Sequence, residues 1–153
     1  MNHKVAVLIG SDTDRPILEK SIPYFNYFSI DVEILTMSAH RNPDVVAEFC
    51  KSARVNGYSI LVGAAGMAAH LAGAIKANSS LPVIGVPLPG GILDGLDSVL
   101  STMQMPKGVP VATMSVGGAG AINAAILCAE ILSLNDESIV DKLNEFKKNG
   151  SKI

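Results

Sequence analysis

Short apolar runs recur along the chain and alternate with segments of helical pattern. The runs lie at 5–10, 32–38, 59–65, 82–87 and 110–115. Most are continuous rather than alternating, which is typical of strands covered by helices on both faces. Helical spacing or alanine-rich composition marks residues 15–28, 43–56, 67–78, 117–134 and 136–148. This order predicts a single three-layer, doubly wound α/β domain over 1–153, with a central parallel sheet and a C-terminal helical tail at about 136–148.

The segment 88–108, LPGGILDGLDSVLSTMQMPKG, interrupts that rhythm. It contains a glycine-rich loop, a short helix predicted over about 95–102, and a further loop around Pro106. Because it follows a central strand at its carboxyl end, we expect a lid or a contact with a neighbouring subunit there.

Composition narrows the possible partners. The chain has 153 residues, is 48% hydrophobic and carries a net charge of -2. This apolar surplus suggests a buried subunit interface. The longest basic run is Lys147-Lys148, so we expect no nucleic-acid partner. The longest apolar stretch is short and contains Glu130, so we expect no membrane span.

The two cysteines, Cys50 and Cys128, lie far apart without metal-binding spacing. Their apolar helical context is typical of buried free thiols. It also fits a reducing compartment, so we expect a cytoplasmic protein.

Four polar or glycine-rich loops follow the first four predicted strands. They are GSDTD (10–14), SAHRNPD (38–44), GAAGMAAH (63–70) and PLPGG (87–91). Ligands of open parallel sheets bind beyond the carboxyl ends of the strands, so these loops should converge on one crevice.

The first loop offers groups suited to a phosphorylated sugar. Ser11 and Thr13 supply hydroxyls, and the start of the next helix supplies free N–H groups for a phosphate. Asp14 is an acceptor for a ribose hydroxyl. A turn with a helix cap explains the same residues, and spacing alone leaves both interpretations open.

The second loop combines a helix start with two residues that the helix does not need. Asn42 is a favourable N-cap and Pro43 a favourable first helical residue. His40 can exchange protons near neutral pH, and Arg41 is a planar, permanent cation suited to phosphate. A solvated loop histidine is the alternative, but a second histidine in the next loop, His70, favours a shared site.

Several nucleotide-binding classes are disfavoured. Neither 63–73 nor 117–123 spaces its glycines as a dinucleotide fingerprint requires, and no P-loop lysine is present. The last predicted strand lacks the lysine expected of a receiver domain. Aromatic residues make up 5% of the chain and tryptophan is absent, which disfavours flavin stacking.

Four stretches together resemble the 5-(carboxyamino)imidazole ribonucleotide mutase family of de novo purine biosynthesis. They are GSDTD, SAHRNPD, GMAAHLAG…LPVIGVP and GLDSVLSTMQMPKGVPVATMSVGGAGAINAAIL, and the likeness runs from about residue 4 to 134. The resemblance implies a flavodoxin-like fold, a homo-octamer and a ribonucleotide substrate, with neither metal nor organic cofactor. Thr13 stands where the family usually has serine, and Met67 where glycine is common. The Met67 side chain could narrow the pocket or equally point into a subunit interface.

The resemblance also implies roles for individual residues. In the implied reaction a carboxylate moves from the exocyclic nitrogen of an aminoimidazole ribonucleotide to carbon 4 of its ring. His40 would give and take the proton, and His70 would orient the reacting groups. Residues implied to bind substrate are Ser11, Thr13, Asp14, Ser38, Ala39, Arg41, Pro43, Ala65, Gly66, Met67 and Ala68. The backbone of 64–69 would confine carbon dioxide, and the loop 104–106 would reach a neighbouring subunit's site.

Two other functions stay open on the sequence. The first is a direct carboxylase that joins free carbon dioxide to the aminoimidazole ribonucleotide; the second histidine block, AAGMAAHLAG, favours the mutase instead. The other is a nucleotide-binding module without catalytic activity.

Overall fold

The computed structural model describes residues 3–153, and its centre is one parallel sheet. The strands are β1 (His3–Ile9), β2 (Ile30–Thr36), β3 (Tyr58–Ala65), β4 (Val83–Pro87) and β5 (Ala112–Thr113). Their spatial order is β2-β1-β3-β4-β5, the order of flavodoxin-like folds. The predicted fold class is therefore confirmed. The switch point, where ligands of such sheets bind, falls between β1 and β3.

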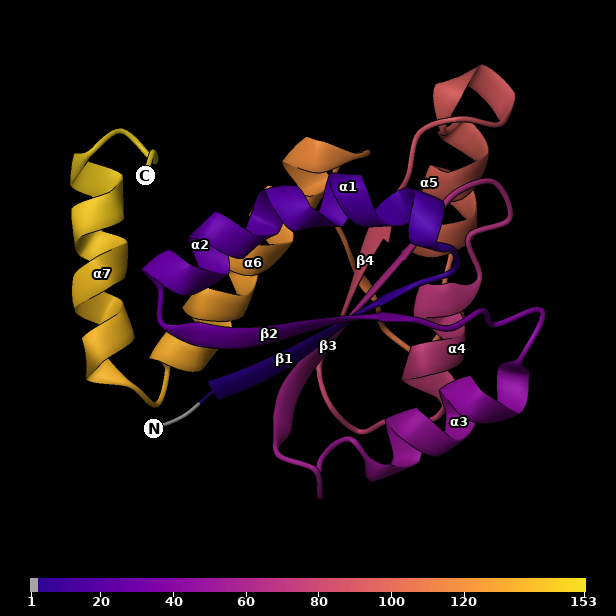
Figure 1. Ribbon diagram of the computed structural model, residues 1–153, viewed down its shortest axis with the longest axis horizontal. Coiled ribbons are helices and arrows are strands. Elements are labelled where there is room, and N and C mark those ends of the chain that lie inside the picture. The colour runs from indigo at the N-terminus through magenta and orange to yellow at the C-terminus, as the bar shows by residue number, and fades with distance from the viewer. Residues whose placement is uncertain (1–2) are drawn as a thin grey trace.

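Helices cover both faces of the sheet (Figure 1). They are α1 (Arg15–Leu18), α2 (Ile22–Tyr27), α3 (Pro43–Ser52), α4 (Leu71–Ala77), α5 (Leu96–Met103), α6 (Gly118–Ser133) and α7 (Glu137–Lys148). Three 3-10 turns lie among them: η1 (Asp12–Asp14), η2 (Glu19–Ser21) and η3 (Ile92–Asp94). The helices α1, α2, α6 and α7 pack on one face, and α3 and α4 pack on the other with α5 beside α4.

The strands show why their apolar runs are continuous. In β1, Val5, Val7 and Ile9 enter the core under α6, whereas Ala6 and Leu8 enter the core under α3 and α4. Side chains alternate between the two faces of a strand, so burial on both faces demands an apolar residue at every position.

The predicted helix at 15–28 is interrupted. It forms α1 and α2 with the turn η2 between them, because Pro23 has no N–H to continue the helical hydrogen bonding. The Ser21 hydroxyl donates to the Leu18 carbonyl at 2.6 Å and satisfies an acceptor at the break.

Three other predicted elements are shorter than expected. The helix expected over 43–56 ends at Ser52. The helix at 67–78 begins only at Leu71, because Met67 adopts a positive φ of 52° in a turn before it. The last strand, expected over 110–115, pairs only at Ala112 and Thr113. It lies at the sheet edge and begins two residues after Pro110, a residue that cannot donate to a strand ladder.

The C-terminal helix is part of the core. Asp136 caps α7 by accepting from the Ser138 N–H at 3.0 Å, and Ile139, Leu143 and Phe146 are buried against the sheet-facing helices. The alanine-rich helix α6 is likewise buried along one side, with Ala121, Ala124 and Ala125 in the core.

Both cysteines are buried and free, as predicted. Burial raises the pKa of the Cys50 thiol to about 11 and raises that of Cys128 further. Neither thiol is therefore a ready nucleophile at neutral pH.

Close packing of α4 on β3 gives a first testable prediction. A Cβ at Gly63 would lie 2.7 Å from Ile75 Cδ1 and 2.8 Å from the Ala72 Cα. Because a backbone atom cannot move aside cheaply, we expect Gly63→Ala to lower the free energy of unfolding by about 1–3 kcal/mol in urea denaturation. In the control Gly73→Ala the new Cβ would meet only the Met105 thioether at 3.4–3.5 Å. This control should leave the free energy of unfolding unchanged or raise it by up to about 1 kcal/mol, because alanine favours a helix more than glycine does. Equal urea midpoints for the two variants would contradict this account of the packing.

Candidate functional site

A cavity of about 410 Å³ lies beyond the carboxyl ends of the central strands. It is lined by Gly10, Ser11, Thr13, Asp14, Ser38, Ala39, His40, Arg41, Ala65, Gly66, Met67, Ala68, His70, Leu71, Pro89, Gly90 and Gly91. All four loops that the sequence pointed to contribute to it. Pro43 is the one predicted site residue that does not line the cavity. It is the first residue of α3 and lies beyond the turn that enters the pocket.

The first loop places two hydroxyls side by side. Ser11 Oγ accepts from the Thr13 hydroxyl at 2.9 Å and from the Thr13 N–H at 3.3 Å, so Ser11 does cap the turn η1. Ser11 is the acceptor in both bonds, so its own O–H can point into the pocket. Partial burial raises the pKa of the Asp14 carboxyl above its ordinary value, although a backbone hydrogen bond from Ser11 opposes the shift.

The first loop is fastened to the end of β2. Asp12 Oδ1 accepts from the Thr36 hydroxyl at 2.5 Å and from Arg15 Nη2 at 3.3 Å. Arg15 also donates to the Ile34 carbonyl at 3.2 Å. Hydrogen bonds from Thr36 and then Arg15 lower the pKa of Asp12, so it stays an acceptor at neutral pH. The network therefore fixes the first loop relative to the second, which begins just after Thr36.

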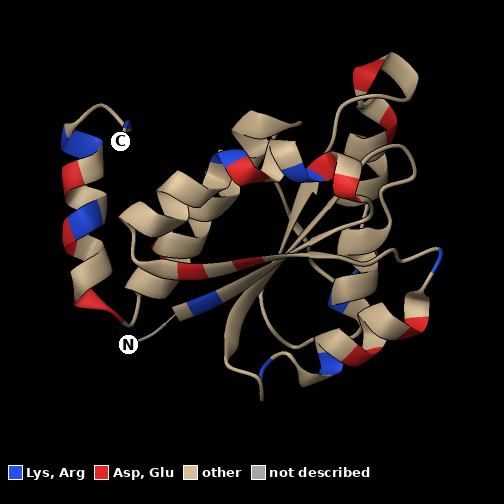
Figure 2. Ribbon diagram, viewed as in Figure 1, with Lys and Arg blue, Asp and Glu red and all other residues tan. Residues whose placement is uncertain are grey.

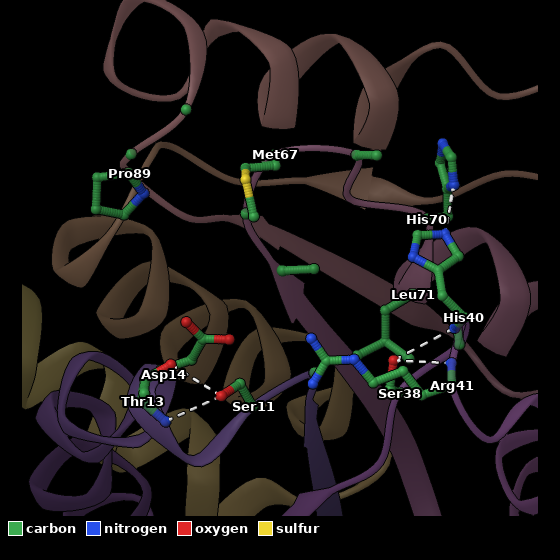
Figure 3. A pocket seen from close by; sticks show the side chains of 17 residues that line it. Ser11, Thr13, Asp14, Ser38, His40, Arg41, Met67, His70, Leu71 and Pro89 are labelled. Atoms are coloured by element: carbon green, nitrogen blue, oxygen red, sulfur yellow. Dashed lines mark hydrogen bonds between the residues drawn. The ribbon is translucent and has the colours of Figure 1, made fainter.

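The second loop is a tight turn around Ser38. Its Oγ accepts from the backbone N–H groups of His40, at 3.3 Å, and Arg41, at 3.2 Å. Asn42 behaves differently from the prediction, because its side chain makes no cap on α3. Instead, Asn42 Oδ1 accepts from the Ser38 N–H at 2.7 Å and closes the turn. Figure 3 shows the result: the His40 ring points toward the third loop and the Arg41 guanidinium toward the first.

The third loop brings the second histidine to the first. The positive φ of Met67 turns the chain, and the Ala69 N–H donates to the Ser101 hydroxyl of α5 at 2.9 Å. His70 then stands at the start of α4, with its Nδ1 2.7 Å from His40 Nε2 and the two rings nearly perpendicular, at 87°. One of these nitrogens donates and the other accepts, so the pair can hold one extra proton and keep its bond.

Charge in the pocket is local. Among the lining residues Arg41 is the only lysine or arginine. In Figure 2 the lysines and arginines are scattered over the fold and form no cluster. An anion in this pocket would therefore meet one permanent cation and the hydroxyls of the first two loops.

Within residues 3–153, no three His, Cys, Asp or Glu side chains are grouped so that they could bind a metal ion. None of the helices in the same part of the chain combines the length and the apolar character that a membrane span requires.

Five lining residues were not among those predicted. They are Gly10, Leu71, Pro89, Gly90 and Gly91. The sequence did single out the fourth loop, PLPGG, as converging on the crevice, and its proline and glycines are three of the five. Nothing in the sequence pattern distinguishes Leu71 from other residues that start a helix.

Known proteins resemble the chain over nearly its whole length. The family model described as AIR carboxylase matches residues 4–152. N5-carboxyaminoimidazole ribonucleotide mutase from Vibrio parahaemolyticus is 43% identical over 144 residues, 94% of this chain and 89% of that protein. The protein of the same name from Bacillus subtilis is 43% identical over 149 residues, 97% of this chain and 92% of that protein.

A solved structure agrees. The crystal structure of Treponema denticola PurE superimposes with a TM-score of 0.88 at 26% identity, covering 98% of this chain and 92% of that one. These matches confirm the resemblance that the four sequence stretches indicated. The chain belongs to the AIR carboxylase family.

Proposed function

We infer that the chain is an N5-carboxyaminoimidazole ribonucleotide mutase of purine biosynthesis. It converts 5-carboxyaminoimidazole ribonucleotide to 4-carboxy-5-aminoimidazole ribonucleotide. Relatives 43% identical over nearly the whole chain have this name. The observation that carries the inference for this chain is the 2.7 Å contact between His40 and His70, in the same pocket as Arg41.

The nucleotide's phosphate would bind where the first two loops meet. Ser11, Thr13 and Ser38 offer hydroxyls there, and Arg41 offers a guanidinium that matches phosphate geometry. Asp14 would accept from the ribose. This orientation would place the base at the other end of the pocket, beside His40 and along the backbone of 65–68.

His40 would act as general acid and then general base. In the first step the carbamate C–N bond breaks, carbon dioxide departs, and the nitrogen accepts a proton from the His40 imidazole. In the second step the electron pair at ring carbon 4 attacks carbon dioxide and forms the new C–C bond. That carbon then loses its proton to His40. The bond to His70 would hold the ring in place through both transfers.

Assembly and location follow as further parts of the proposal. We propose a homo-octamer in the cytoplasm, in which the loop at 104–106 reaches a neighbouring subunit's site. Support comes from exposed apolar side chains on η3 and α5: Ile92, Leu93, Leu96, Leu100 and Met103. Such groups mark subunit interfaces, and sedimentation of the intact protein would measure the assembly.

The network at Asp12 gives a prediction about substrate binding. Thr36→Val keeps the shape of the side chain but removes the hydroxyl that Asp12 accepts from. We expect KM to rise about 2–10-fold with little change in kcat, since one hydrogen bond that positions the phosphate loop is lost. Thr36→Ser retains the hydroxyl and should leave KM near its original value. Steady-state kinetics of both variants measures the difference, and an equal KM in both would show that the hydroxyl does not matter.

The function itself is tested with the carbamate nucleotide labelled in its carboxylate. We expect ultraviolet absorbance to show formation of the 4-carboxy product, with the label retained and without added bicarbonate. A direct carboxylase would instead require bicarbonate and dilute the label with unlabelled carbon. A binding module without activity would show affinity and no product.

A further inference from the structure

Met67 occupies a backbone conformation that its side chain does not favour. Its φ is 52°, in the left-handed region, where a bulky residue costs about 1–3 kcal/mol. The turn needs this conformation, because the N–H groups of Ala69 and His70 donate to the carbonyls of Met67 and Ala68, both at 2.9 Å. A residue without a side chain would make the same turn with less strain. The turn therefore does not explain why a methionine stands here.

Packing does not explain the methionine either. The Met67 side chain is 64% exposed and belongs to neither of the two cores. It lines the cavity, and Figure 3 shows the thioether extending from the third loop into the pocket, between Pro89 and His70 in that view. An apolar side chain held in a strained position and exposed in the pocket points to a role toward the ligand.

No other side chain of the third loop has comparable reach. Before His70, that loop lines the cavity with Ala65, Gly66, Met67 and Ala68. Alanine and glycine leave the backbone accessible but cannot cover a ligand. Methionine has three rotatable bonds and a polarizable thioether, so it can adapt its shape over a bound ring.

We propose that Met67 is the wall that closes this pocket over the reacting end of the nucleotide and retains carbon dioxide between the two steps. The role rests on the proposed mutase function, in which carbon dioxide is free for a moment beside His40. Escape of carbon dioxide leaves aminoimidazole ribonucleotide as a by-product. An apolar cover excludes water and slows that escape without affecting the proton transfers.

The test measures how often a turnover releases aminoimidazole ribonucleotide instead of the 4-carboxy product. The carbamate nucleotide is incubated with the full-length protein in buffer where carbonic anhydrase and a gas stream remove free carbon dioxide. The ratio of aminoimidazole ribonucleotide released to 4-carboxy product formed is then measured, after subtraction of spontaneous decarboxylation. We expect Met67→Ala to raise this ratio about tenfold, the effect of roughly one lost side-chain contact. Met67→Leu, which restores an apolar side chain of similar volume, should restore a low ratio.

Two further variants separate this role from stability. Met67→Gly also removes the thioether but relieves the left-handed strain, so it should raise the melting temperature and still raise the ratio. Val55→Ala removes an apolar side chain at a residue that is 89% exposed and does not line the cavity. This variant should change neither the melting temperature nor the ratio.

The outcomes also separate this role from the function on which it rests. A wild-type protein that forms no product would overturn both. Normal conversion with an unchanged ratio in Met67→Ala and Met67→Gly would overturn the role of Met67 alone. If these variants kept the ratio unchanged but sedimented as a smaller assembly than the wild-type protein, the proposed role of Met67 would also be overturned. Met67 would then be assigned to a subunit contact.

Discussion

His40→Asn should lower kcat by about 10²–10⁴-fold, the usual contribution of general acid–base catalysis. Asparagine can still occupy the space beside His70 and hydrogen-bond to it, but it cannot exchange a proton at neutral pH. Affinity for the nucleotide should change little, because the phosphate and ribose contacts come from other side chains. Single-turnover kinetics measures the first effect and calorimetric titration the second.

His3 provides the matched control. It is a histidine remote from the pocket, with its Nε2 2.8 Å from Asp136. His3→Asn should keep kcat within about twofold, as expected for a change away from the chemistry. If His40→Asn retained the original kcat, proton transfer by this residue would be refuted.

Arg41→Ala should weaken nucleotide binding by about 10–100-fold, since hydrogen bonds to charged groups contribute about 1.5–3 kcal/mol. Arg41 is the only lysine or arginine that lines the cavity, so no neighbouring cation there can replace it. Titration with the 4-carboxy ribonucleotide product measures the dissociation constant. The loss should be much smaller for the nucleoside without its phosphate.

Arg54→Ala is the control for the removal of one positive charge. Arg54 lies away from the cavity, with its Nε 3.4 Å from the Ser80 hydroxyl. Its removal should leave the dissociation constant unchanged. Equal losses for nucleotide and nucleoside in Arg41→Ala would mean that this guanidinium does not bind the phosphate.

The position of the site could be predicted because the topology decides it. Continuous apolar runs separated by helical segments require a parallel sheet, and the carboxyl ends of parallel strands share one edge. His40, Arg41 and His70 follow such strands directly. Their convergence on one cavity therefore needed no knowledge of side-chain packing.

The local geometry could not be predicted in the same way. Asn42 has a favourable type for a helix cap, but the turn around Ser38 offers its side chain a closer N–H. The break between α1 and α2 depends on Pro23, at a point where the apolar spacing of 15–28 continues without interruption. The hydrogen bond between the histidines depends on the left-handed turn at Met67, and a sequence pattern gives no φ angle.

The most direct test of the account is a crystal structure of the protein with 4-carboxy-5-aminoimidazole ribonucleotide bound. We expect the phosphate within hydrogen-bonding distance of the Arg41 guanidinium and the Ser11 and Thr13 hydroxyls. The His40 ring should lie within hydrogen-bonding distance of the exocyclic nitrogen or the new carboxylate. A phosphate bound away from Arg41, or a His40 ring turned away from the base, would contradict the account.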